Sequence, residues 1–308
     1  MTTHQSFTPP SLPPTSLIIC SRNRPALLRE TVDSVLQGDE VPTELIIVDQ
    51  SDVAHTTLAT LSTKRACALR YLWTHSVGLS CARNTGLAAA THDIVTIIDD
   101  DMFVTTTWFG TLIRALLSAG EHAVVTGRVL PTAAETPGGF VLALVVGNFP
   151  AVYVGRIGTD VLAGGHMAAY RSAFAEVGGF DERLGAGATF AAADDNDLGF
   201  RLLEAGYRII YVPEAVLYHR AWRSRRDYLP MHWNYGRGKG GFYTKYLSLR
   251  DRYMLRRMVW DIAHRVLLFP RHVCYERHRA CADAVYVLGI LSGAVQWILT
   301  QRSRTATW

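Results

Sequence analysis

The sequence lacks the features that would assign it to several common classes of protein. Its five cysteines are odd in number, scattered and without CxxC spacing, which argues against a disulfide framework or a zinc site and favours reduced thiols in a cytosol. The N-terminal residues have neither the basic start nor the apolar core of a secretory signal. No glycine-rich phosphate loop follows the first apolar run, which argues against a nicotinamide-dependent dehydrogenase and an NTPase.

The composition predicts a globular protein with two differently charged parts. Of its 308 residues, 49% are hydrophobic and 19% are charged, and this length suits one large domain or one domain with an appendage. Residues 1–218 carry 14 Lys/Arg against 22 Asp/Glu, whereas residues 219–308 carry 17 against 5. The basic part predicts a surface for anionic partners, such as phospholipid head groups or substrate phosphates. Nucleic acid is not expected as a partner, because no helix-turn-helix, RNA-binding or zinc-finger pattern accompanies the charge.

Short apolar runs alternate with helical patterns over the first half of the chain. We expect strands at residues 17–20, 45–48, 71–73 and 94–98 and around 123–125. We expect helices from Pro25, after a loop within 78–90, and from Trp108. This alternation predicts βαβ units and an α/β fold, namely an αβα sandwich with a mainly parallel sheet. A Pro-rich leader, residues 1–15, precedes the first strand and is expected to be disordered.

Acidic side chains stand at the ends of two of the expected strands. Asp99, Asp100 and Asp101 follow the apolar run 94–98, and Asp49 follows an earlier run. Ligands of such sheets bind beyond the carboxyl ends of the strands, so these carboxylates would converge on one crevice if the strands are neighbours. Like charges repel unless a cation lies among them, and carboxylates suit Mg²⁺ or Mn²⁺ bound together with substrate phosphates. The alternative is a solvated acidic turn.

A second region rich in glycine and aspartate lies further along the chain. Residues 164–167 are expected to be a flexible turn that leads into a short helix ending near Gly178. The Asp-Asp-Asn-Asp run at 194–197 opens a further helix. Its carboxylates either cap free N–H groups, or one of them is a general base that faces the metal site. His219 follows a strand and is either a third metal ligand or a surface histidine.

Six short stretches occur together in an order typical of one enzyme family. They are Ser16–Pro25, Ile46–Asp49, Gly78–Leu87, Asp99–Asp101, Gly178–Glu182, and Asp194–Leu198 followed by Arg201. With these residues the chain resembles a family 2 glycosyltransferase of the A-type, nucleotide-sugar-binding fold, over about residues 16–222.

The resemblance implies roles for individual acidic residues. Asp49 would contact the uracil or other base of the nucleotide, while Asp99 and Asp100 would lie against ribose and metal. Asp101 would be the principal metal ligand, with Asp99 assisting it. Asp195 would be the catalytic base that takes a proton from the acceptor.

The resemblance extends to residues outside the acidic stretches, with two departures. His219 would close the metal site, and Ser21 and Arg83 would join the nucleotide-sugar-binding residues, with Arg83 either steadying the diphosphate or pairing with a nearby acid. Asp194 replaces the usual Glu, which leaves either aspartate of that pair as a candidate base. His166 stands where Asn is common, which would alter the acceptor or diphosphate contacts.

The resemblance implies an inverting, metal-dependent glycosyltransferase of the hexosyltransferase type. It would move a sugar from a nucleotide-diphospho-sugar to a saccharide or lipid-linked acceptor in cell-envelope, polysaccharide or glycolipid synthesis, with Mn²⁺ or Mg²⁺ as cofactor. One alternative is a sugar nucleotidylyltransferase, although such an enzyme would carry a glycine-rich, basic loop after its first strand. Another is a non-catalytic protein that binds nucleotide sugars.

The carboxyl-terminal part, residues 223–308, is expected to be a basic, mainly helical extension of a catalytic domain at 16–222. Residues 235–242 mix glycines with cations, which is typical of a lid over a diphosphate or of a solvated loop. Residues 253–269 have the pattern of an amphipathic helix. Residues 284–301 are uncharged but fall short of the ~20 apolar residues of a secure membrane span. We therefore expect peripheral attachment to the inner face of the cell membrane, and no pattern indicates an oligomeric state.

Overall fold

The structure, a computed structural model, describes residues 11–55, 58, 67–135, 137–248 and 250–305. The first ten residues of the expected leader lie outside this description. Leu12 packs against the hydrophobic core, and Thr15 begins the first strand. The folded part therefore starts slightly before the boundary expected from the sequence.

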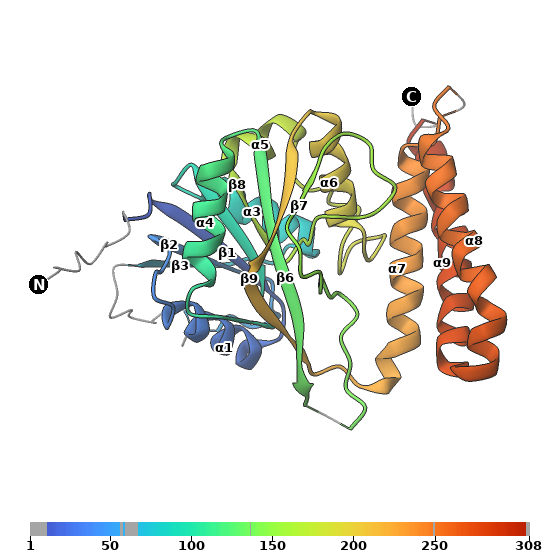
Figure 1. Cartoon of the computed structure of the whole chain (residues 1–308), viewed down its shortest axis with the longest axis horizontal. Helices are drawn as coiled ribbons and strands as arrows, with labels where there is room; N and C mark the ends of the chain where they lie inside the picture. Colours follow the sequence, from blue (N-terminus) through green and yellow to red (C-terminus); the bar gives the residue numbers. More distant parts are fainter. Residues whose placement is uncertain (1–10, 56–57, 59–66, 136, 249, 306–308) are drawn as a thin grey trace, which may run out of the picture.

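Within the described residues, the strands form one nine-stranded mixed sheet, in which β1, β2, β3, β4, β6 and β9 run in the same direction (Figure 1). Its order is β3-β2-β1-β4-β8-β6-β9-β5, with β7 paired to β9. The strands are β1 Thr15–Ser21, β2 Glu44–Asp49, β3 Ala68–Trp73, β4 Ile94–Asp99, β5 Met102–Val104, β6 Ala123–Ala134, β7 Ala151–Tyr153, β8 His166–Tyr170 and β9 Arg208–Ala221. β1 to β4 are parallel, as are β6 and β9, while β8 runs antiparallel between β4 and β6. The predicted αβα architecture is confirmed.

Helices cover both faces of the sheet, and three further helices form a separate layer at one end (Figure 1). The helices are α1 Pro25–Leu36, α3 Leu79–Ala89, α4 Trp108–Ala119, α5 Arg171–Val177, α6 Asp194–Glu204, α7 Tyr228–Lys245, α8 Tyr253–Tyr275 and α9 Arg277–Thr305. α1 and α4 share one hydrophobic core with the sheet, and α3, α5 and α6 share the other. α7, α8 and α9 pack together beside α6 around a smaller core.

The apolar runs form strands because both of their faces are buried. In β1, Leu17 and Ile19 face the core with α1 and α4, whereas Ile18 and Cys20 face the opposite core. A strand with no solvent-facing side needs no polar alternation, so it appears in the sequence as a continuous apolar run. The polar residues that end these runs are then left at one edge of the sheet.

His166 and Met167, expected in a flexible turn over 164–167, instead begin the strand β8. Met167, Ala168 and Ala169 are fully buried between β4 and β6. This short strand carries no β-branched residue and has two alanines, a residue depleted in strands, so its local strand preference is weak. The pairing with two longer strands, rather than local preference, determines its conformation.

Residues 235–242 lie inside helix α7, so the expectation of a lid or a solvated loop is wrong. The glycines of this segment allow α7 to contact α9 backbone to backbone. A Cβ atom on Gly240 would lie 2.1 Å from the carbonyl oxygen of Ile290, and one on Gly293 would lie 2.2 Å from that of Arg237. Close helix packing of this kind requires residues without side chains at the crossing. The expected helix at 253–269 is confirmed and extends to Tyr275 as α8.

Gly240→Ala is expected to destabilise the protein by about 1–3 kcal/mol, because the added methyl group would overlap the Ile290 carbonyl oxygen. In a solvent-exposed helix, replacing glycine by alanine would stabilise the protein by about 1 kcal/mol. The sign of the change in stability therefore shows whether α7 and α9 are in close contact at Gly240. Urea denaturation followed by circular dichroism measures it. Gly158→Ala is the control, since its added methyl group meets open space. Equal urea midpoints for Gly240→Ala and the unmodified protein would contradict the close α7–α9 contact.

Candidate functional site

The predicted site residues converge at the carboxyl-terminal edge of the parallel strands. Ser21 at the end of β1 is in register with Asp49 at the end of β2, and Cys20 is in register with Asp99 at the end of β4. Because β8 runs antiparallel, its first residue, His166, lies at the same edge. The carboxyl ends of β1, β2 and β4 therefore present their polar residues together, as expected for neighbouring parallel strands.

Asp49 is fully buried, and both of its carboxylate oxygens accept hydrogen bonds from the chain itself. Ser51 donates through its backbone N–H (2.9 Å) and its hydroxyl, and the Tyr71 hydroxyl donates at 2.5 Å. Burial and the adjacent Asp49 carboxylate raise the pKa of Tyr71 to about 12, so the phenol stays a donor. These bonds hold the turn after β2 firmly in place; a contact of Asp49 with a nucleotide base stays a prediction.

The three consecutive aspartates are paired with two arginines: Asp99 with Arg83, and Asp100 and Asp101 with Arg24. Asp100 is buried, accepts a hydrogen bond of 2.5 Å from the Ser21 hydroxyl and lies 2.6 Å from an Arg24 guanidinium nitrogen. Asp99 pairs with Arg83 at 2.8 Å. Burial raises the pKa of Asp100 to about 7, although Arg24 opposes the rise. The repulsion expected within the triple is therefore relieved by two arginines.

Asp101 lies among cationic and polar groups at the end of the long strand β9. The His219 Nε2 atom is 3.8 Å from its Oδ1, Arg24 is 3.2 Å from its Oδ2, and the Trp222 indole N–H donates at 3.0 Å. The backbone N–H of Arg220 donates to the Asp101 carbonyl oxygen, which ties β9 to this turn. Burial opposes ionisation of Asp101, but His219 and Arg24 outweigh it and hold its pKa below the usual range.

Asp101 and His219 fit the donor set of a divalent cation. Two ligand atoms that share an ion at about 2.1 Å each must lie within about 4.2 Å of one another, and the observed 3.8 Å meets this condition. In the described part of the chain, no three carboxylate, imidazole or thiol groups form a complete cluster for a metal. Such a two-residue set needs substrate phosphates as further ligands, which is the usual situation of Mg²⁺ in phosphate-binding sites. Asp99, paired with Arg83, stays a predicted third ligand.

Arg83 links the strand ends to the start of helix α6. Its buried guanidinium binds Asp99 on one side and Asp194 on the other. The expected pairing of Arg83 with a nearby acid is thus observed, while a contact of Arg83 with the diphosphate stays a prediction. Burial keeps the pKa of Asp194 above its usual range in spite of Arg83. Asp194 is thus paired with Arg83, which leaves Asp195 as the candidate for proton transfer.

Asp195 is held by two backbone amides and not by a cation. The N–H groups of Asn196 (2.8 Å) and Gly164 (3.3 Å) each donate to one of its carboxylate oxygens. Burial, reinforced by Asp194, raises its pKa to about 7. A carboxylate with this pKa changes protonation near neutral pH, as a general base requires. Asp197, in contrast, binds Arg201, Lys245 and the Tyr246 hydroxyl and has a structural role.

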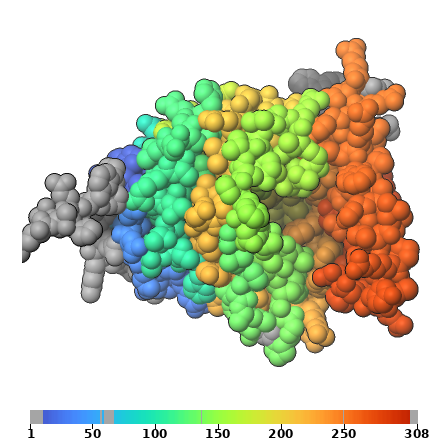
Figure 2. All heavy atoms as spheres, viewed as in Figure 1, coloured from blue at the N-terminus to red at the C-terminus, as the bar shows by residue number. Residues whose placement is uncertain are grey.

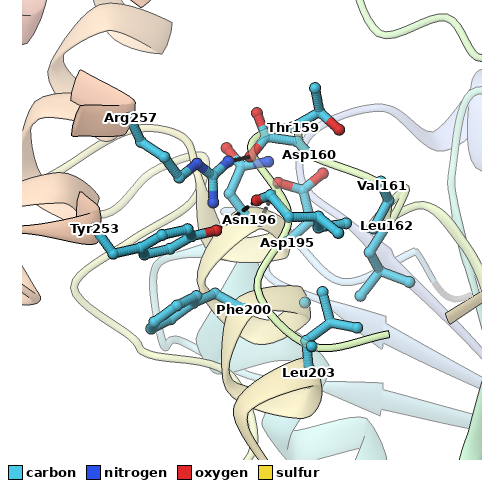
Figure 3. Close-up of a pocket in the computed structure, with 13 residues that line it drawn as sticks. Thr159, Asp160, Val161, Leu162, Asp195, Asn196, Phe200, Leu203, Tyr253 and Arg257 are labelled. Carbon is cyan, nitrogen blue, oxygen red and sulfur yellow. Dashed lines mark hydrogen bonds and ion pairs between the residues drawn. The ribbon is translucent and has the colours of Figure 1, made fainter. Parts of the chain in front are cut away.

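The residues around the inner side of Asp195 are tightly packed (Figure 3). The cavity here measures about 10 Å³ and is lined by Asp195, Asn196 and Phe200 of α6, by the segment that leads into β8, and by Tyr253 and Arg257 of α8. A space of this size holds about one water molecule. A substrate must therefore approach Asp195 from the other side, at the sheet edge.

His166 lies in the core and not in the crevice. The Trp108 indole N–H donates to its Nε2 at 2.7 Å, and burial lowers its pKa to about 3, so the imidazole is neutral. The buried position of His166 therefore does not support the expectation that this histidine, in place of the family's Asn, alters acceptor or diphosphate contacts. Its side chain instead connects β8 to α4.

Sequence reasoning missed several residues of the site. Arg24 and Trp222 both contact Asp101. The guanidinium carbons of Arg24 and Arg223 lie 5.6 and 4.6 Å from the centroid of the Trp222 ring. Arg24 lies within the first of the matching stretches, and Trp222 and Arg223 lie in the arginine-rich segment after His219. Nothing in their local sequence distinguishes them from surface residues.

Comparisons with known proteins agree with this arrangement. The model of the family "Glycosyl transferase family 2" matches residues 16–178. A pre-mycofactocin glycosyltransferase of Mycobacterium tuberculosis is 31% identical over 166 residues, which cover 53% of this chain and 34% of that protein. The chain thus spans about a third of the length of this relative. A glucosyl-dolichyl phosphate glucuronosyltransferase of Haloferax volcanii is 26% identical and is matched over 69% of this chain and 71% of its own length.

The fold is also found among solved structures. The mannosyltransferase PcManGT from Pyrobaculum calidifontis, in complex with GDP-Man and Mn²⁺, superposes with a TM-score of 0.60 at 18% identity. The match covers 92% of this chain and 87% of that protein, so the similarity extends into the carboxyl-terminal helices.

Arg83→Met is expected to lower the stability by about 3–5 kcal/mol near neutral pH, because it leaves buried carboxylates without their cation. The loss should shrink as the pH falls below neutral, towards the raised pKa of Asp194. An acid whose folded-state pKa is raised costs stability above its unfolded pKa, and protonation of Asp194 removes that cost. Urea denaturation at several pH values measures the effect.

Arg29→Met is the matched control, since Arg29 forms an exposed pair with Asp33 on α1. Its effect should stay within about 0.5 kcal/mol at every pH. A pH-independent loss for Arg83→Met would show that packing, and not charge neutralisation, is the contribution of Arg83.

Proposed function

The chain belongs to glycosyltransferase family 2, and on this premise we propose that it transfers a sugar from a nucleotide-diphospho-sugar to an acceptor hydroxyl with inversion at the anomeric carbon. The observation that carries the proposal is the division of the acidic cluster into two parts. Asp101 and His219 form one part, suited to a cation with phosphates, and Asp195 forms the other, suited to proton transfer. An inverting transfer needs both at one edge of the sheet.

Asp195 is the proposed general base. Two amide donors fix its orientation, and its raised pKa lets it accept the proton of the acceptor hydroxyl near neutral pH. The hydroxyl oxygen then attacks the anomeric carbon as the bond to the leaving diphosphate breaks, through an oxocarbenium-like transition state. Asp194 takes no part in the proton transfer, because Arg83 holds it.

Asp101 and His219 are the residues that would hold Mn²⁺ or Mg²⁺, with Asp99 as the further candidate ligand. Such an ion would neutralise the negative charge that develops on the leaving diphosphate. Imidazole favours Mn²⁺ over Mg²⁺ if His219 ligates. Arg223 forms no ion pair with an acid among the described residues and lies beside Trp222, so it is available for a phosphate. Ser21 and Asp49 lie at the edge where the nucleotide would bind.

A lipid-linked acceptor is the proposed second substrate. The name of the Haloferax volcanii relative describes an acceptor sugar on dolichyl phosphate. The basic carboxyl-terminal part of this chain suits such a phosphate, since residues 219–308 carry 17 Lys/Arg against 5 Asp/Glu. We place the reaction in cell-envelope glycolipid or polysaccharide synthesis.

Asp195→Asn should lower the rate of transfer by a factor of about 10²–10⁴ while nucleotide-sugar binding is retained, because only the proton acceptor is lost. The assay measures release of nucleoside diphosphate from a panel of nucleotide sugars with and without Mn²⁺, and calorimetry measures binding. Asp33→Asn, on the exposed side of α1, is the control for the same chemical change.

Turnover of Asp195→Asn close to that of the unmodified protein would remove Asp195 from the mechanism. Release of pyrophosphate from a nucleoside triphosphate and a sugar 1-phosphate, with no nucleoside diphosphate released from any nucleotide sugar, would identify a nucleotidylyltransferase. Binding of nucleotide sugars without turnover of any donor by the unmodified protein would identify a non-catalytic binding protein.

We further propose that α8 and α9 attach the protein to the cytoplasmic face of an anionic membrane. Figures 1 and 2 show these helices at one end of the molecule, away from the sheet. Their exposed apolar side chains include Trp260, Leu267, Tyr275, Leu288 and Leu291. By length and composition, residues 277–301 could cross a membrane. However, one side of this helix packs against α7 through Gly289 and Gly293, so we favour attachment to the membrane surface over a membrane-spanning helix.

The unmodified protein should sediment with vesicles that contain anionic lipid and much less with neutral vesicles. Each exposed arginine near the surface contributes about 1 kcal/mol, and salt weakens this term. The double variant Trp260→Ser/Leu267→Ser should bind less tightly, because it removes exposed apolar side chains from α8. Val53→Ser, which removes an exposed apolar side chain from the segment after β2, outside α8 and α9, is the control. Absence of binding to anionic vesicles at low salt would exclude the proposal.

A further inference from the structure

Two buried cations of the carboxyl-terminal helices share one carboxylate next to the site. The Lys239 ammonium of α7 binds Asp160 Oδ2 at 2.6 Å, and the Arg257 guanidinium of α8 binds Asp160 Oδ1 at 2.8 Å. The side chains of Lys239 and Arg257 are 8% and 7% exposed, whereas that of Asp160 is 37% exposed. Buried cations are costly unless they are paired, so this carboxylate fixes the loop that carries it to both helices.

That loop, residues 154–165, joins β7 to β8 and ends at the candidate base. Gly164 lies in this loop four residues after Asp160, and its N–H donates a hydrogen bond to Asp195. Gly164 is also confined, since a Cβ atom there would lie 2.9 Å from both the Asp195 Cβ and an Arg83 nitrogen. Figure 3 shows Asp160, Asp195 and Arg257 around the same small cavity. The position of the Gly164 amide therefore depends on where Asp160 is held.

Helix α7 also contacts the segment on the other side of the candidate base. A Cβ atom on Gly238 would lie 2.6 Å from the Ala192 carbonyl carbon and oxygen, and one on Gly241 would lie 2.7 Å from the Phe190 ring. This segment leads into α6 through Ala193, which has a positive φ of 69°, a conformation unfavourable for a residue with a side chain. The contact with α7 thus confines the backbone directly before Asp194 and Asp195.

We propose that Asp160, Lys239 and Arg257 are positioning residues for Asp195, so that helices α7 and α8 belong to the catalytic centre. None of the three touches the reacting atoms. They hold the Gly164 amide against one oxygen of Asp195, while α7 holds the segment before α6, and together these contacts fix the direction in which the carboxylate presents its free lone pairs. This proposal rests on the proposed function of Asp195 as the base.

The test compares Asp160→Asn with Asp261→Asn in the full chain. Asp261 is the matched control, because it binds Arg265 and the hydroxyls of Tyr243 and Tyr286. It thus joins α8 to α7 and α9, and none of these contacts is with the loop. Hydrogen–deuterium exchange of peptides that cover 161–168 and 191–198 is the first measurement. We expect exchange there to speed up at least about threefold in Asp160→Asn and to stay unchanged in Asp261→Asn.

The second measurement is the steady-state rate of transfer. A misplaced base should lower kcat about 10- to 100-fold and leave the KM for the nucleotide sugar within about twofold, because the donor site is untouched. Lys239→Met keeps Asp160 paired with Arg257 and supplies the same comparison if Asp160→Asn does not fold. Lys239→Arg, which restores the cation, should return kcat towards that of the unmodified protein.

Unchanged exchange and unchanged kcat in folded Asp160→Asn and Lys239→Met would overturn the proposal, as would equal effects of Asp261→Asn. The exchange measurement needs no turnover. If the unmodified protein transfers no sugar, the proposed function fails, while the exchange result still decides whether Asp160 holds the segment at Gly164.

Discussion

The arrangement of the site depends on the buried guanidinium of Arg83. It binds the end of β4 through Asp99 and the start of α6 through Asp194, two elements that are 95 residues apart in the chain. Without a cation between them, these carboxylates would repel one another in a region with little water. Arg83 therefore makes it possible for an acidic crevice to exist before any ion or substrate arrives.

A second arginine completes the division of the acidic cluster. Arg24 neutralises Asp100 and Asp101, as Arg83 neutralises Asp99 and Asp194. Asp195 forms no ion pair within the described part of the chain, and burial, reinforced by Asp194, raises its pKa. The pKa of Asp101, with His219 and Arg24 beside it, is lowered instead. Neighbouring carboxylates thus acquire the two opposite properties that binding a cation and accepting a proton require.

The sequence predicted the parts of the fold that depend on local pattern. Doubly buried strands such as β1 are continuous apolar runs, and the acidic residues that follow them mark the sheet edge. It did not predict β8, whose conformation comes from pairing with β4 and β6. It also did not predict helix α7, because the glycines at 236–241 favour a loop until Gly289 and Gly293 of α9 pack against them. Likewise, Arg24 and Asp160 acquire their roles only through partners far away in the chain.

The carboxyl-terminal helices connect the two ends of the proposed reaction. On α8, Arg257 points inward to the loop that ends at Gly164, whereas Val259, two residues later and on the opposite side of the helix, is 54% exposed. A helix is about 10 Å across with its side chains, so a surface that contacts Val259 lies about that distance from Arg257. A sugar acceptor anchored in a membrane must bring its hydroxyl to a base held near that membrane. Helix α8, with one face on the base-supporting loop and the other available to lipid, satisfies this geometric requirement.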